Sequence, residues 1–170
     1  MRAPATLFRQ CLAELAGTFV LVSFGTGIVH AAVLTGAQQG RWQVAVVWGS
    51  GVSLALYATG AISGAHLNPA RTVARMLLKG FPPRKVPPYI ISQLLGALCA
   101  AAVLFALYSH ILRDFEPAHG LLRGAPGSEL SAMVYGEYFP NPALARSLHW
   151  SDASVSHGQA MPAGERKGRR

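Results

Sequence analysis

Charged residues are scarce in this sequence. Asp, Glu, Lys and Arg together make up 13% of the 170 residues, about half of the roughly 25% found in an ordinary soluble domain. Residues 42–70 and 86–112 include no charged residue, and residues 10–40 include only Glu14. These gaps argue against a soluble enzyme and against a disordered chain. Because a helix needs about 20 apolar residues to cross a bilayer core of about 30 Å, they predict three membrane helices.

Cysteine is also rare, since the sequence has only Cys11 and Cys99, far apart and both in apolar stretches. This excludes a disulfide framework, and we expect two buried free thiols. No grouping of possible ligands is typical of a metal site, so no metal and no other cofactor is predicted. The net charge of +8 could suit nucleic acid, but the basic residues flank the apolar stretches. The expected partner is therefore the lipid bilayer and not nucleic acid.

The apolar stretches define an all-α membrane protein. We expect transmembrane helices at about 7–34, 43–61 and 88–111. The first is interpreted as a retained helix, because its apolar run is too long for a signal peptide. All three stretches are rich in Gly, Ala, Ser and Thr, which indicates helices that pack closely against other helices within the membrane.

A shorter helix is predicted at residues 68–79. The segment 62–70, which leads into it, is uncharged but rich in residues that favour turns. A helix of about 12 residues is too short to cross the bilayer. The pattern therefore predicts a re-entrant half-helix, whose irregular backbone is tolerated at membrane depth where it lines a cavity or is covered by protein.

Lys and Arg residues indicate the orientation of the chain, because they favour the cytoplasmic side. Those before the first helix and around the half-helix are Arg2, Arg9, Arg75, Lys79, Arg84 and Lys85. They place the N-terminus in the cytoplasm, with the protein in a plasma or inner membrane. We divide the chain into a helical repeat at 1–112, an external loop segment at 113–145 and a polar basic tail at 146–170, which we expect to be disordered.

The start of the predicted half-helix has the composition of a binding site. Asn68 is a favoured N-cap and Pro69 a favoured first residue, which in a soluble protein would indicate only a capped helix start. Near the bilayer centre, this helix end would direct free N–H groups and partial positive charge into the site, and the Asn68 amide could donate as well. The carbonyls of Gly64, Ala65 and His66 would offer a line of acceptors. Such an arrangement suits water or a neutral polyol, whose hydroxyls both donate and accept.

Four segments, in order along the chain, resemble the major intrinsic proteins, the family of aquaporins and glycerol facilitators. Residues 63–70 are similar to the first signature loop of that family. Residues 13–19 and 92–97 are similar to parts of its first and third helices, and residues 138–142 to the external loop of its glycerol facilitators. The resemblance covers residues 7–145.

The resemblance implies a fold of two inverted three-helix repeats, each with one half-helix. This sequence shows the first repeat with its Asn68-Pro69-Ala70 motif, but no second half-helix. Residues 141–143 repeat the letters Asn-Pro-Ala, and we interpret them as a coincidence within the external loop. The implied protein is a passive channel polypeptide for glycerol, water and similar neutral solutes, truncated and unable to form a pore alone.

Several modes of action stay open for such a chain. It could pair with a chain that carries the second repeat or with further copies of itself, or be an inactive product of a frameshift. Alternatively, it is a non-conducting membrane fragment that associates with a full-length channel and modulates it. An intramembrane enzyme is not predicted, since Glu14 and His66 have no Ser or Asp at a useful spacing.

Three further residues receive roles from the resemblance. Trp48 would belong to the outer selectivity filter, as an apolar wall for the carbon side of a polyol, or alternatively to an interfacial aromatic belt. Glu14 would brace the re-entrant loop through backbone N–H groups. Arg71 departs from the apolar residue usual in the family, and we expect it to pair with Glu14 or else to project into the pore.

Overall fold

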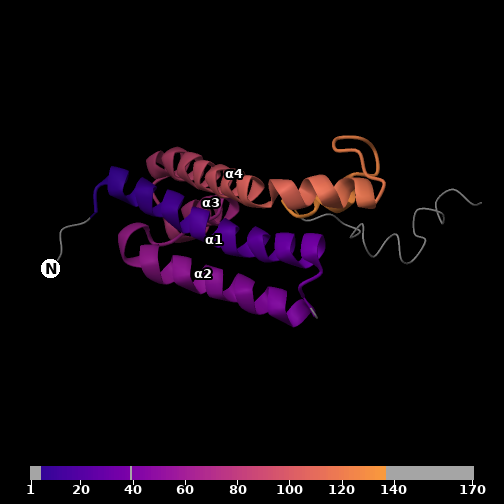
Figure 1. The fold of residues 1–170 in the computed structure, drawn as a ribbon. Coiled ribbons are helices and arrows are strands. Elements are labelled where there is room, and N and C mark those ends of the chain that lie inside the picture. The colour runs from indigo at the N-terminus through magenta and orange to yellow at the C-terminus, as the bar shows by residue number, and fades with distance from the viewer. Residues whose placement is uncertain (1–4, 39, 137–170) are drawn as a thin grey trace, which may run out of the picture. The chain divides into compact units, whose positions relative to one another are not determined.

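The computed structural model describes residues 5–38 and 40–136, and these residues form helices and turns without any strand (Figure 1). Residues 138–142 and 141–143 and the predicted tail at 146–170 lie outside the described residues.

Three long helices dominate the fold. They are α1 (Leu7–Thr35), α2 (Arg41–Ser63) and α4 (Val86–Ala118), and each is long and apolar enough to cross a membrane. At 1.5 Å per residue, even α2 is roughly 34 Å long, which exceeds the bilayer core. The three predicted membrane helices are therefore confirmed.

Helix α1 lies between the other two long helices and packs against both (Figure 1). The outer faces of the three helices expose large apolar side chains, among them Phe8, Tyr57 and Leu98. Cys11 and Cys99 are free thiols, but Cys99 is exposed, so the expectation that both are buried was wrong. An apolar residue of a membrane helix can face lipid instead of a protein core, so hydrophobicity alone does not predict its burial.

Glycines allow the long helices to approach each other closely. A side chain on Gly96 of α4 would collide with the backbone carbonyl of Leu15 in α1. A side chain on Gly25 of α1 would collide with the Trp48 indole of α2. The small residues of the sequence thus lie at the helix crossings, as expected for association within lipid.

The chain between α2 and α4 turns back into the helical unit. After α2 ends at Ser63, an irregular segment leads to the short helix α3 (Pro69–Lys79), and a 3-10 turn at Pro83–Lys85 leads into α4. Leu67 and Thr59 both contact the same position of α1, Gly17. Gly17 lies ten residues inside α1, or roughly 15 Å from its start, so the irregular segment reaches the middle part of this helix. The predicted re-entrant half-helix is therefore confirmed.

Helix α4 extends to Ala118, beyond the predicted end at residue 111. The charged residues that follow Leu112 mark the end of the apolar run, but they do not break a helix in water. The helix ends just before Gly120, which has a left-handed φ of 65°. Arg123 then folds back and donates to the Glu116 carboxylate at 2.9–3.1 Å, and this hydrogen bonding raises the pKa of Arg123. A short helix α5 (Glu129–Ala132) follows.

The crossing of α1 and α4 provides a direct test of this packing. We expect Gly96→Ala to destabilise the protein by about 1–3 kcal/mol, because the new methyl group would meet the rigid Leu15 carbonyl. The measurement is unfolding of the detergent-solubilised protein in a denaturant series, followed by circular dichroism. Gly49→Ala in α2 is the matched control, since nothing lies within 4 Å of its Cβ position. Equal effects of the two substitutions would contradict the packing.

Candidate functional site

The Glu14 side chain organises the re-entrant segment. It is fully buried, and its two oxygens accept four hydrogen bonds. Oε1 accepts from Ser63 Oγ at 2.6 Å and from the His66 backbone N–H at 2.8 Å. Oε2 accepts from the Leu67 backbone N–H at 2.6 Å and from Gln93 Nε2 at 2.7 Å. The predicted contact of Glu14 with backbone N–H groups of the loop is present, and the carboxylate also ties this loop to α2 and α4.

The backbone of this segment has an unfavourable conformation. Gly64, Ala65 and Leu67 have φ angles of 83°, 45° and 56°, in the left-handed region that side chains disfavour. Each non-glycine residue held there costs on the order of 1–3 kcal/mol. The hydrogen bonds from His66 and Leu67 to Glu14 offset this cost. The shape of the loop therefore depends on one buried carboxylate.

Thr72 and Gln93 connect the base of α3 to the same network. Gln93 Nε2 donates to Glu14 and also to Thr72 Oγ1, at 3.0 Å. The Thr72 hydroxyl donates to the Asn68 carbonyl at 3.0 Å and contacts His66 Nδ1 at 3.2 Å. Sequence reasoning assigned no role to Thr72 or Gln93. For Gln93, the sequence signal was a polar amide in a charge-free membrane helix, where a polar side chain is expected to have a hydrogen-bond partner.

The His66 side chain is enclosed and faces no open site. Its ring packs against Phe81 and Tyr89, with ring centroids 4.5 Å and 5.1 Å away. The Tyr89 hydroxyl donates to the Ser63 carbonyl at 3.0 Å, so the carbonyl of the last residue of α2 has a hydrogen-bond partner. The His66 imidazole therefore supports the loop.

The first turn of α3 offers no free N–H group, so that part of the prediction was wrong. The Asn68 Oδ1 atom accepts from the Ala70 N–H at 2.8 Å and from the Arg71 N–H at 3.3 Å. The Thr72 N–H donates to the Asn68 carbonyl at 3.0 Å, and Pro69 has no N–H. The cap that starts the helix thus satisfies the donors that we expected the site to use.

Within the described residues, one amide donor and three carbonyls are left without a hydrogen-bond partner, although two of these carbonyls belong to Ala65 and His66, which are 2% and 1% exposed. Because Oδ1 of Asn68 is held by the cap, its Nδ2 group is the free end of an exposed side chain. Within the part of the chain that the structure describes, no hydrogen bond reaches that Nδ2 group or the carbonyl oxygens of Gly64, Ala65 and His66. A donor beside several acceptors matches a hydroxyl group, which needs both.

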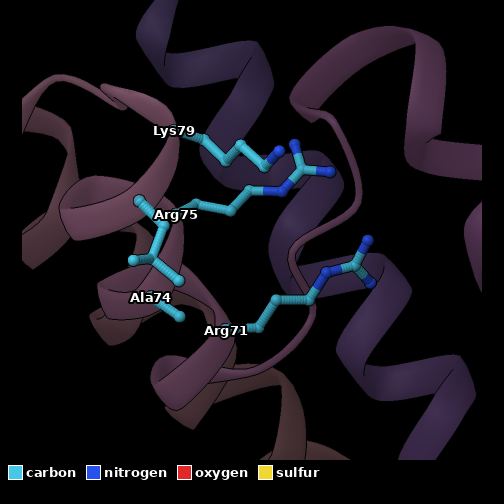
Figure 2. A pocket seen from close by; sticks show the side chains of 5 residues that line it. Arg71, Ala74, Arg75 and Lys79 are labelled. Atoms are coloured by element: carbon cyan, nitrogen blue, oxygen red, sulfur yellow. The ribbon is translucent and has the colours of Figure 1, made fainter.

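Arg71 does not form the predicted pair with Glu14. Among residues 5–38 and 40–136, the ion pair that the structure contains joins Arg123 and Glu116. Both Glu14 oxygens already accept two hydrogen bonds each, so they have no need of a cation. The Arg71 side chain instead lies with those of Arg75 and Lys79 on one side of α3 (Figure 2).

Trp48 lies on α2 against Gly25 of α1 and does not meet the Asn68 region. It precedes the end of α2 at Ser63 by 15 residues, or roughly 22 Å of helix. The structure thus brings together Glu14 and the loop residues, whereas Trp48 lies farther along α2. The role of Trp48 in a selectivity filter stays a prediction.

Comparisons with known proteins agree with this geometry. The sequence model of the family described as "Major intrinsic protein" matches residues 2–136. The chain belongs to this family. It is 48% identical over 140 residues to the glycerol uptake facilitator protein of Pseudomonas aeruginosa, a match that covers 82% of this chain and 50% of that protein. It is 46% identical to the corresponding Escherichia coli K12 protein, over 85% of this chain and 51% of that one.

A third relative is a propanediol uptake facilitator of Salmonella typhimurium, 43% identical over 88% of this chain and 55% of that protein. Among solved structures, the aquaglyceroporin from Plasmodium falciparum is similar, with a TM-score of 0.60 and 29% identity over 64% of this chain and 45% of that chain. The chain spans about half the length of the curated relatives it matches. These findings, together with the three long apolar helices, identify a family member that is integral to the membrane.

The Glu14 network leads to a stability prediction. We expect Glu14→Gln to destabilise the protein by about 2–5 kcal/mol, because an amide nitrogen would replace one acceptor and leave two buried donors unpaired. Chemical unfolding in detergent, followed by circular dichroism, measures the change. Glu129→Gln is the matched control, since Glu129 is exposed, and it should change stability by less than about 0.5 kcal/mol. A Glu14→Gln protein as stable as the control would show that the network does not hold the loop.

Proposed function

We propose that this chain supplies one half of a passive membrane pathway for glycerol, water and similar small neutral solutes, without a cofactor. The observation that carries the proposal is that, among the described residues, the exposed Asn68 amide and the carbonyls of residues 64–66 have no hydrogen-bond partner. The names of the relatives, as uptake facilitators for glycerol and propanediol, support the substrate class.

In this proposal, a solute hydroxyl accepts a hydrogen bond from Asn68 Nδ2 and donates to one carbonyl of the loop. The next hydroxyl, or the next water, occupies the following carbonyl. The partial positive charge at the start of α3 disfavours a cation at the same position, including a hydronium ion. Pro69 and Ala70 place the amide, since they start the helix that Asn68 caps.

Trp48 is proposed to line the pathway at a second level along α2. Its indole is partly exposed and rests on Gly25. A rigid aromatic face suits the carbon side of a polyol, while the hydroxyls face polar groups. Glu14 acts in the proposal as a positioning residue, and Arg71 is proposed to add positive charge beside the first turn of α3.

The pathway needs a second wall, because Asn68 is exposed on the described unit. We propose that this wall comes from a chain that carries the second repeat, and that residues 1–170 alone give no flux. A second copy would have to insert in the opposite direction, which the distribution of Lys and Arg resists. The same distribution supports a cytoplasmic N-terminus.

Asn68→Asp tests the amide donor. Asp is as good an N-cap as Asn, so the helix should form, but a carboxylate replaces the donor. The protein is reconstituted in liposomes together with the second repeat of the Pseudomonas aeruginosa facilitator, and glycerol efflux is followed by light scattering. We expect the substitution to lower the flux by about tenfold or more, which corresponds to about 1.4 kcal/mol.

Gln38→Glu serves as the matched control, because it makes the same chemical change in the turn after α1. It should leave the flux unchanged. Unaltered flux in the Asn68→Asp protein, or full flux from liposomes that hold residues 1–170 alone, would overturn the proposal.

A further inference from the structure

Three cationic side chains of α3 line one pocket. Arg71, Arg75 and Lys79 follow each other at four-residue intervals, which places them on one face of the helix. Figure 2 shows the three side chains pointing to the same side of α3. Together with Ala74 and Leu78 they surround a pocket of about 370 Å³.

The described chain provides no counter-charge for this pocket. Between residues 5 and 113 the sequence contains one acidic residue, Glu14, which is buried and already accepts four hydrogen bonds. The next acidic residue, Asp114, lies near the far end of α4, roughly 40 Å along that helix from Val86. Within the described ranges no ion pair involves the three cations. Like charges at this spacing repel each other, and a bound anion would remove the repulsion.

The pocket also has an apolar side. Leu78 lines it and is 78% exposed. A free inorganic anion gains nothing from exposed leucines, whereas a phospholipid presents a phosphate and an acyl chain together. The three long apolar helices of the same unit are suited to lipid surroundings.

We propose that this pocket binds the phosphate of an anionic phospholipid headgroup between Arg75 and Lys79, with an acyl chain against Leu78. Lys79 ends α3, and the basic residues Arg84 and Lys85 follow within the next six positions. This end of the helix is therefore the one suited to the headgroup region, where basic residues gain about 1 kcal/mol each from anionic lipid. Arg71, two turns away, adds to the positive potential.

The test uses the full chain in a neutral detergent. Dioctanoyl-phosphatidylglycerol, dioctanoyl-phosphatidylcholine and inorganic phosphate are titrated separately, and bound molecules are counted by native mass spectrometry. We expect phosphatidylglycerol to bind at least about tenfold more tightly than phosphatidylcholine, and Arg75→Gln with Lys79→Gln to remove this difference. The charge-conserving pair Arg75→Lys with Lys79→Arg should retain it, which separates loss of charge from misfolding.

Arg9→Gln with Arg113→Gln is the matched control, because it removes two exposed charges outside the pocket. It should leave the affinity for phosphatidylglycerol within about twofold. The proposal is overturned if the two lipids bind equally, if the control pair loses the preference to the same extent, or if inorganic phosphate binds as tightly as phosphatidylglycerol. Glycerol flux is not a readout here, so the outcome is independent of the proposed transport function.

Discussion

The structure depends on a carboxylate that is buried among apolar helices. Removing such a group from water costs several kcal/mol unless hydrogen bonds compensate. Glu14 receives this compensation from two backbone N–H groups of the loop, one side chain of α2 and one of α4. The same four bonds hold a loop with left-handed non-glycine residues. One interaction therefore stabilises the buried charge, the strained backbone and the position of α3.

The strained loop leaves backbone carbonyls without a hydrogen-bond partner among the described residues. In a regular helix or strand, each backbone carbonyl would accept a hydrogen bond from the chain itself. Here the carbonyls of residues 64–66 receive none from the described residues, while their N–H groups donate to the Gly60 carbonyl, the Ser63 hydroxyl and the Glu14 carboxylate, respectively. The unfavourable backbone thus leaves three carbonyls without a partner among the described residues. The Asn68 cap uses Oδ1 and leaves the Nδ2 group of the same side chain as a donor.

Much of the fold could be predicted from the sequence, because its signals are local. The lengths of the charge-free stretches set the number of membrane helices, and Asn68-Pro69 marked the start of α3 to within one residue. The end of α4 was missed because charged residues mark the edge of the apolar run without breaking the helix. The exposure of Cys99 was missed because an apolar residue of a membrane helix can face lipid instead of a protein core.

The sequence by itself determined the helices, the turn-rich re-entrant segment and the resemblance to the major intrinsic proteins. It could not tell whether Glu14 pairs with Arg71 or with the loop, since residues 14, 66, 67 and 93 meet only when α1, α2 and α4 pack. Tertiary structure also decided that Trp48 packs against Gly25 of α1, away from Asn68. Such contacts depend on helix crossings and side-chain direction, which no local pattern of residues encodes.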